Sequence, residues 1–105
     1  MIDQALLDQA TILLRETAHP QKIILFGSHA RNEASADSDI DILVVETDVK
    51  DRVSEMVRLG RTLSPLRIPV DLLVVSVEMY NYWSDTPGNV YYQARTEGRV
   101  IYEAA

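Results

Sequence analysis

The stretch from Gly27 to Val45 places the strongest constraint on how this chain can fold. It follows a short apolar run, Lys22 to Phe26, that contains β-branched residues and is too short for a buried helix, which predicts a central strand. Gly27 and Ser28 end that run, and the small polar residues at 32–38 predict a loop. Asp39 to Glu46 then predicts a second strand, and the rest of the chain is expected to support this unit.

On both sides of this unit the pattern alternates between helix and strand. Apolar residues three and four apart predict a helix over residues 3–18, with Asp3 as its N-cap and Pro20 preventing its continuation. A second helix is expected over residues 49–63, with Asp48 as its N-cap. The buried stripe of that helix is expected to consist of Val49, Val53, Met56, Val57 and Leu63.

The second half of the chain adds shorter elements. Val70 to Val75 is apolar except for Asp71 and predicts a third strand. Residues 77–84 and 89–96 predict short helices, the second closed by Gly98, and residues 99–103 predict an edge strand. Helices that alternate with strands predict an α/β (α+β) fold, with a small mixed β-sheet flanked by helices. At 105 residues, the chain is expected to form one domain, residues 1–105.

The composition excludes several classes of protein. Apolar residues make up 47% of the chain and charged residues 25%, as in ordinary globular proteins. The absence of cysteine excludes disulfides and thiolate metal sites. The net charge of -6 argues against a nucleic-acid-binding surface, which needs a basic face. Because no run approaches the ~20 apolar residues of a membrane span, we expect no membrane association and a cytoplasmic location.

Two aspartates on the second strand suggest a metal site. Asp39 and Asp41 are two residues apart, so on a strand their side chains share a face, with Cα atoms about 6.6 Å apart. Two like charges on a strand otherwise suited to burial are costly, and a divalent cation such as Mg²⁺ resolves the conflict. If the strand that carries Asp71 lies beside the second strand, three carboxylates converge in the two-metal arrangement of phosphoryl or nucleotidyl transfer.

The Gly-Ser turn predicts the other half of this site. Gly27 allows the backbone to come close to a ligand, and the N–H groups that follow, with the Ser28 hydroxyl, can bind phosphate oxygens. Arg31 lies one turn further on and can reach a phosphate as well. A simple ion pair of Arg31 with Glu33 or Asp37 is the alternative interpretation.

Several of these residues together resemble the motif of a known family. Gly27-Ser28, Ala30-Arg31 and Ser38-Asp39-Ile40-Asp41, with Asp71 downstream, resemble the minimal nucleotidyltransferase (MNT) family of the polymerase-β-like nucleotidyltransferase superfamily. The resemblance extends over nearly the whole chain, including the ending at residues 97–103. It departs from the family at Asn32, where glycine is frequent. Because asparagine tolerates left-handed backbone, we expect the turn to be kept.

The resemblance implies a function and a set of roles. Gly27 and Ser28 would hold the triphosphate of ATP, the nucleotide donor. Asp39 and Asp41 would bind Mg²⁺, with two ions expected, and Asp71 would complete the metal site and assist the attacking hydroxyl. The implied activity is a protein adenylyltransferase that transfers AMP to a tyrosine of a HEPN-type toxin. The chain would then act as the antitoxin of a type VII toxin–antitoxin pair.

Other interpretations stay open at this point. The chain could neutralise a toxin by binding alone, or could transfer a nucleotide to a small molecule. Asp71 could cap a strand or pair with Arg67. His29 is interpreted as an exposed or packing histidine, and Ser38 as a residue that supports the loop.

Aromatic residues gather in the second half of the chain. They are expected mostly to pack on the sheet, with one or two left for an interface or for stacking on a base. They are Tyr80, Tyr82, Trp83, Tyr91 and Tyr92.

Overall fold

The computed structural model describes residues 3–35 and 38–105. In chain order its elements are α1 (Gln4–Ala18), β1 (Lys22–Phe26), α2 (Gly27–Ala30), β2 (Ile40–Glu46), α3 (Arg52–Leu63), the 3-10 turn η1 (Ser64–Leu66), β3 (Val70–Ser76), α4 (Val77–Trp83), α5 (Val90–Glu97) and β4 (Arg99–Glu103). Every helix and strand expected from the sequence is present, and some of them begin or end at other residues than predicted.

The strands form one mixed sheet in the order β3-β2-β1-β4. β1 pairs antiparallel with both β2 and β4, whereas β2 and β3 run parallel. The parallel pair needs a crossover, and α3 with η1 supplies it. These pairings confirm the predicted mixed sheet and the edge position of the last strand.

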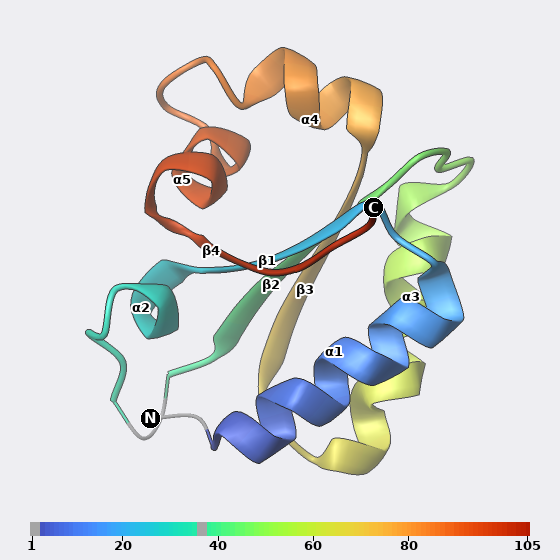
Figure 1. Ribbon diagram of the computed structural model, residues 1–105, viewed down its shortest axis with the longest axis vertical. Helices are drawn as coiled ribbons and strands as arrows, with labels where there is room; N and C mark the ends of the chain where they lie inside the picture. Colours follow the sequence, from blue (N-terminus) through green and yellow to red (C-terminus); the bar gives the residue numbers. More distant parts are fainter. Residues whose placement is uncertain (1–2, 36–37) are drawn as a thin grey trace.

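Helices cover both faces of this sheet (Figure 1). On one face, α1 and α3 pack on alternate strand residues, and α4 and α5 pack on the other face. The first core contains Leu7, Ala10, Leu14, Ile23, Leu25, Ile40, Ile42, Val44, Leu59, Leu63 and Val74. The second contains Ile24, Phe26, Leu43, Val45, Val75, Tyr80 and Ala94. Such continuous burial explains why β1 and β2 are apolar without alternation.

The first helix follows its sequence signals closely. The Asp3 side chain accepts a hydrogen bond from the Ala5 backbone N–H at 2.9 Å, as expected of an N-cap. The helix ends at Ala18, and His19 adopts a left-handed conformation with φ 46° before Pro20. No helix among the described residues is both long and apolar enough to cross a membrane.

The start of α3 differs from the sequence-based prediction. The N-cap is Asp51 rather than Asp48, because the Asp51 side chain accepts a hydrogen bond from the Ser54 N–H at 3.1 Å. The helix therefore covers Arg52–Leu63, shorter than the predicted range. The predicted stripe was also partly wrong, since Val53 and Val57 are 65% and 48% exposed. Leu59 and Leu63 are the residues of α3 that are buried against the sheet.

The turns on either side of the polar loop also show local differences. Ser28 lies inside α2, whose N-cap position is Phe26, so Ser28 is not the residue that caps this helix. Asn32 has φ 58°, which confirms that the turn survives without glycine at this position. The second strand starts at Ile40, one residue later than predicted, so Asp39 precedes it.

Gly98 is the C-cap of α5, as predicted, but the left-handed backbone that often favours glycine at helix ends is not the reason for it here. Its φ of -81° is ordinary and not left-handed. A Cβ at this position would instead collide with the Ala94 carbonyl and with Ile24 of the sheet. Close helix–sheet packing therefore requires the glycine.

Candidate active site

The Gly-Ser turn joins β1 to α2 at one end of the sheet. Gly27 is buried and has φ 72°, a conformation that L side chains rarely adopt. A Cβ built on it would overlap the Asp41 carboxylate, which therefore lies directly against the turn. The register explains this contact, because Asp41 pairs with Phe26, the last residue of β1.

The parallel pairing of β2 and β3 brings two of the predicted acids side by side. Asp41 is the direct partner of Asp71 in this register. Both have the strand parity of the residues that pack toward α4 and α5, such as Leu43 and Val75, so their side chains share that face of the sheet. β3, which carries Asp71, therefore lies beside β2, as the predicted convergence of the three carboxylates requires.

Asp39 lies just before β2 and is exposed, as is Asp71. The backbone next to Asp39 is tied to β3, because the Ile40 N–H donates a hydrogen bond to the Pro69 carbonyl at 2.8 Å. No ion pair joins Asp71 to Arg67 in the part of the chain that the structure describes.

Burial and both neighbouring acids raise the pKa of the Asp41 carboxyl. Burial raises the pKa of the Asp41 carboxyl above its usual range, and the charges of Asp71 and then Asp39 raise it further. His29 and Arg31 act in the opposite direction on the same pKa. Asp71 and Asp39 therefore both lie close enough to Asp41 for their charges to oppose its ionisation.

This donor set fits a hard divalent cation. All three side chains offer carboxylate oxygens, and a cation between them relieves the repulsion that raises the Asp41 pKa. Among residues 3–35 and 38–105, however, no three His, Cys, Asp or Glu side chains are spaced to hold one metal by themselves. This is compatible with Mg²⁺, which usually takes one or two protein carboxylates and completes its shell with water and phosphate oxygens.

Arg31 lies at the end of α2 and makes two ion pairs. Its guanidinium is 3.3 Å from the Glu33 carboxylate and 3.5 Å from that of Glu97, at the end of α5. The pair with Glu33 was one of the alternatives given by the sequence, and the other partner, Asp37, lies outside the described residues. Sequence reasoning missed Glu97, because nothing in the sequence indicates that the ends of α2 and α5 meet.

His29 has a specific partner that the sequence did not indicate. Its Nε2 lies 3.2 Å from the Ser38 carbonyl oxygen, across nine residues of chain. Because a carbonyl only accepts, Nε2 carries the proton and donates. The side chain is half-buried between α2 and the loop before β2.

The aromatic residues divide into buried and exposed groups. Tyr80 is buried in the core under α4, and the Tyr91 hydroxyl accepts a hydrogen bond from Arg52 at 2.9 Å. Tyr82 and Trp83 are 69% and 38% exposed and meet edge to face, with ring centroids 4.9 Å apart. Tyr80 and Tyr91 therefore pack on the sheet, as expected. Tyr82 and Trp83 are the exposed residues to which the predicted interface role applies.

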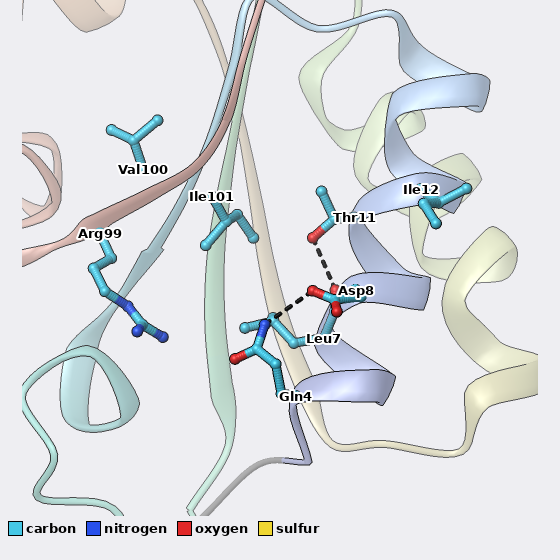
Figure 2. Close-up of a pocket in the computed structure, with 8 residues that line it drawn as sticks. All are labelled: Gln4, Leu7, Asp8, Thr11, Ile12, Arg99, Val100 and Ile101. Atoms are coloured by element: carbon cyan, nitrogen blue, oxygen red, sulfur yellow. Dashed lines mark hydrogen bonds between the residues drawn. The ribbon is translucent and has the colours of Figure 1, made fainter.

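A pocket of about 500 Å³ lies elsewhere, between α1 and β4 (Figure 2). Gln4, Asp8 and Ile12 line it from the helix, and Arg99 and Ile101 line it from the strand. One dashed line in Figure 2 joins Gln4 Nε2 to Asp8 Oδ1 at 2.9 Å, and the other joins the Thr11 hydroxyl to the Leu7 carbonyl oxygen at 2.8 Å. None of the three site aspartates lines this pocket, which is separate from the carboxylate group.

Comparison with known proteins gives this geometry a family. Residues 9–105 match the family described as polymerase beta, nucleotidyltransferase. The chain is 35% identical over 85 residues to a protein of Methanocaldococcus jannaschii that is named as a candidate protein adenylyltransferase, covering 78% of each chain.

Solved structures are similar over almost the whole chain. One is a toxin–antitoxin crystal structure with AMP-PNP, with a TM-score of 0.67 and 26% identity over 98% of this chain and 75% of that one. Another is the complex of the tri-AMPylated Shewanella oneidensis HEPN toxin with its MNT antitoxin. Its TM-score is 0.63, with 26% identity over 98% of this chain and 74% of that one.

The family match, the relative and the fold agree with one another and with the motif that begins at Gly27. The chain carries nucleotidyltransferase activity on this basis, and the resemblance drawn from the sequence is confirmed. This chain belongs to the polymerase beta nucleotidyltransferase family, with MNT antitoxins among its structural neighbours.

Proposed function

We propose that this chain is a Mg²⁺-dependent protein adenylyltransferase that transfers AMP from ATP to a tyrosine of a HEPN-type toxin. In this role it is the antitoxin of a type VII toxin–antitoxin pair. The observation that carries the proposal is the approach of Asp41, Asp71 and Asp39 to one another beside the Gly27 turn. Support for the substrates comes from the relative named for protein adenylylation and from the toxin–antitoxin neighbours.

Each site residue has a role in this proposal. Gly27 and Ser28 bind the triphosphate through backbone N–H groups and the Ser28 hydroxyl, and Arg31 neutralises phosphate charge by exchanging Glu33 or Glu97 for a phosphate oxygen. Asp39, Asp41 and Asp71 hold the Mg²⁺ ions, which when bound neutralise charge on the phosphates and orient them.

The transfer itself is an in-line displacement at phosphorus. The tyrosine hydroxyl oxygen of the acceptor attacks the α-phosphorus of ATP, and the bond from that phosphorus to the bridging oxygen of pyrophosphate breaks. Asp71, exposed at the end of the acid group, accepts the phenolic proton. The products are O-adenylyl-tyrosine and pyrophosphate.

The test uses ATP labelled at the α-phosphate, Mg²⁺ and the purified HEPN-type partner. The wild-type chain should label the partner on tyrosine, located by mass spectrometry of its peptides. Asp39→Asn combined with Asp41→Asn should remove the label. The control Asp8→Asn with Asp48→Asn makes the same charge change at exposed positions outside the acid group and should label normally.

The same experiment separates catalysis from neutralisation by binding alone. If wild type leaves the partner unlabelled while the Asp39→Asn, Asp41→Asn variant still neutralises it fully, the chain is a binding antitoxin. The exposed pair Tyr82 and Trp83 is the observation that favours this second function, because exposed aromatic residues are enriched at interfaces.

A further inference from the structure

His29 connects the two halves of the candidate site through one hydrogen bond. It lies in α2, two residues after Gly27, and its Nε2 donates to the Ser38 carbonyl at 3.2 Å. Ser38 directly precedes Asp39. The phosphate-binding turn and the first acid are therefore joined by a side chain that belongs to neither.

The backbone before Asp39 is also bonded within its own loop, where the Ser38 N–H donates to the Ser35 carbonyl at 3.2 Å and the Ser35 N–H donates to Ser38 Oγ at 3.0 Å, but these bonds do not reach α2. Asp39 precedes β2 and is exposed, so its own side chain is not held by packing. On the β3 side, the Ile40 N–H donates to the Pro69 carbonyl at 2.8 Å. On the α2 side, the hydrogen bond from His29 holds the preceding peptide. Of these contacts, the hydrogen bond from His29 is the one that joins the backbone before Asp39 to α2.

Asp41 needs no such anchor. It lies within β2, paired with Phe26 and Asp71, and its carboxylate lies against Gly27. The sheet therefore fixes Asp41 relative to the turn. The position of Asp39 relative to the same turn depends on the loop. The imidazole also lies close enough to the acids to lower the pKa of Asp41.

We infer that His29 is a positioning residue, which holds Asp39 at the distance from the Gly27-Ser28 turn that lets one metal–nucleotide complex contact both. The inference rests on the proposed function, since it concerns how that site binds its ligand. It assigns His29 no contact with the reacting atoms. Groups that orient metal-binding carboxylates typically change metal affinity or activity by ~10–100-fold when removed.

Substitutions at His29 can separate this role from simple packing. His29→Ala removes the group that donates to the Ser38 carbonyl. His29→Gln places an amide nitrogen near the position of Nε2 and so keeps a donor for that bond. The control His19→Asn removes the other histidine of the chain, which is exposed at the end of α1. Asparagine suits that residue's left-handed backbone, where φ is 46°.

The main readout is the affinity for Mn²⁺ in the presence of AMP-PNP, measured by electron paramagnetic resonance, with thermal unfolding of each variant alongside. We expect His29→Ala to bind Mn²⁺ about tenfold more weakly, and His29→Gln and His19→Asn to bind as wild type does. Partner labelling by each variant should follow the same order.

Three results would overturn the inference, and the last of them also overturns the proposed function. If wild type binds Mn²⁺ with AMP-PNP and His29→Ala binds it equally well, or if His29→Gln is as defective as His29→Ala at an unchanged Tm, His29 does not position Asp39. If the wild-type chain binds neither Mn²⁺ nor AMP-PNP, the proposed function fails and the inference fails with it.

Discussion

At the level of single residues, Gly27 meets two separate requirements. Its φ of 72° lies in the region that costs other residues energy, and its missing side chain leaves room for the Asp41 carboxylate. The first requirement follows from the turn between β1 and α2. The second requires that β2 pairs with β1 in its observed register, so that Asp41 reaches the turn.

Replacing this glycine should therefore damage the site more than the fold. We expect Gly27→Ala to lower partner labelling by about 100-fold, because displacing a site group by about 1 Å can cost that much. The backbone strain should lower the free energy of unfolding by ~1–3 kcal/mol. Rates with labelled ATP and thermal unfolding measure the two effects.

The chain offers a matched control in α3. A Cβ on Gly60 meets nothing within 4 Å, so Gly60→Ala adds a methyl group to open space in a helix. It should raise the free energy of unfolding by ~0.5–1 kcal/mol and leave labelling unchanged. If both glycine substitutions behaved alike, the contact between Gly27 and Asp41 would not matter for the site.

At the level of elements, β2 and α3 meet through a buried acid. Glu46, the last residue of β2, is 7% exposed, and its Oε2 has no hydrogen-bond partner among the described residues. Burial, then a hydrogen bond with Glu55 and the charge of Glu55, raise the pKa of Glu46 to about 8. Arg58 holds Glu55 with two bonds of 2.7 and 2.8 Å, which lowers the pKa of Glu55.

Glu46 should make stability depend on pH between about 4.5 and about 8. Its folded-state pKa lies above the ordinary value of 4.5, so the folded protein keeps a proton that the unfolded chain releases between these two values. The stabilising contribution is full below the unfolded pKa and disappears as pH rises through about 8. Denaturant unfolding should therefore show stability falling as pH rises from about 4.5 to about 8, by an amount on the order of a few kcal/mol.

Glu46→Gln tests the origin of that loss. Glutamine keeps a donor for Glu55 and cannot titrate, so the decline in the free energy of unfolding between about pH 4.5 and about pH 8 should flatten. Glu78→Gln, at an exposed position on α4, should leave the decline as in wild type. If the free energy of unfolding of Glu46→Gln fell with pH as it does in wild type, another titrating group would be the cause.

At the level of the whole molecule, the site combines segments far apart in the chain. The turn follows β1, Asp41 lies on β2, and Asp71 arrives from β3 after the crossover through α3. Asp41 lies opposite Asp71 and beside Phe26, the last residue of β1, so both acids lie at the end of the sheet where β1 leads into α2. Figure 1 shows α2 at this end of β1. The repulsion among them is a consequence of assembling the fold.

This repulsion predicts opposite effects of one substitution on stability and on activity. Asp71→Asn removes a charge that raises the pKa of Asp41, so ionising Asp41 at pH 7 should cost less in the folded state. The Tm of the nucleotide-free protein should rise by a few degrees. Partner labelling should fall by ~10²–10⁴-fold, the usual contribution of a general base.

The measurements are thermal unfolding at pH 7 and an NMR titration of the Asp41 carboxyl, whose pKa should move toward its usual value. Asp8→Asn, on the exposed side of α1, makes the same charge change away from the site and should alter neither. A lower Tm in Asp71→Asn would mean that Asp71 stabilises the fold, as a strand cap or ion-pair partner does.

The strands, turns and backbone conformations that depend on neighbouring residues could be predicted from the sequence. The short apolar runs identified three strands, the Gly-Ser pair identified the turn, and Asn32 kept its left-handed backbone as its side chain allows. The start of α3 was misjudged because Asp48 and Asp51 are both good N-caps, and only the observed bond from the Ser54 N–H distinguishes them.

Tertiary structure decided what depends on pairing between distant segments. The sequence alone shows that Asp39 and Asp41 follow a Gly-Ser turn and that an isolated Asp71 interrupts a later apolar run. Strand register placed Asp71 opposite Asp41, and chain packing brought His29 to the Ser38 carbonyl and Glu97 to Arg31. The physical reason is that register and helix packing minimise the energy of the whole core, so no local pattern encodes them.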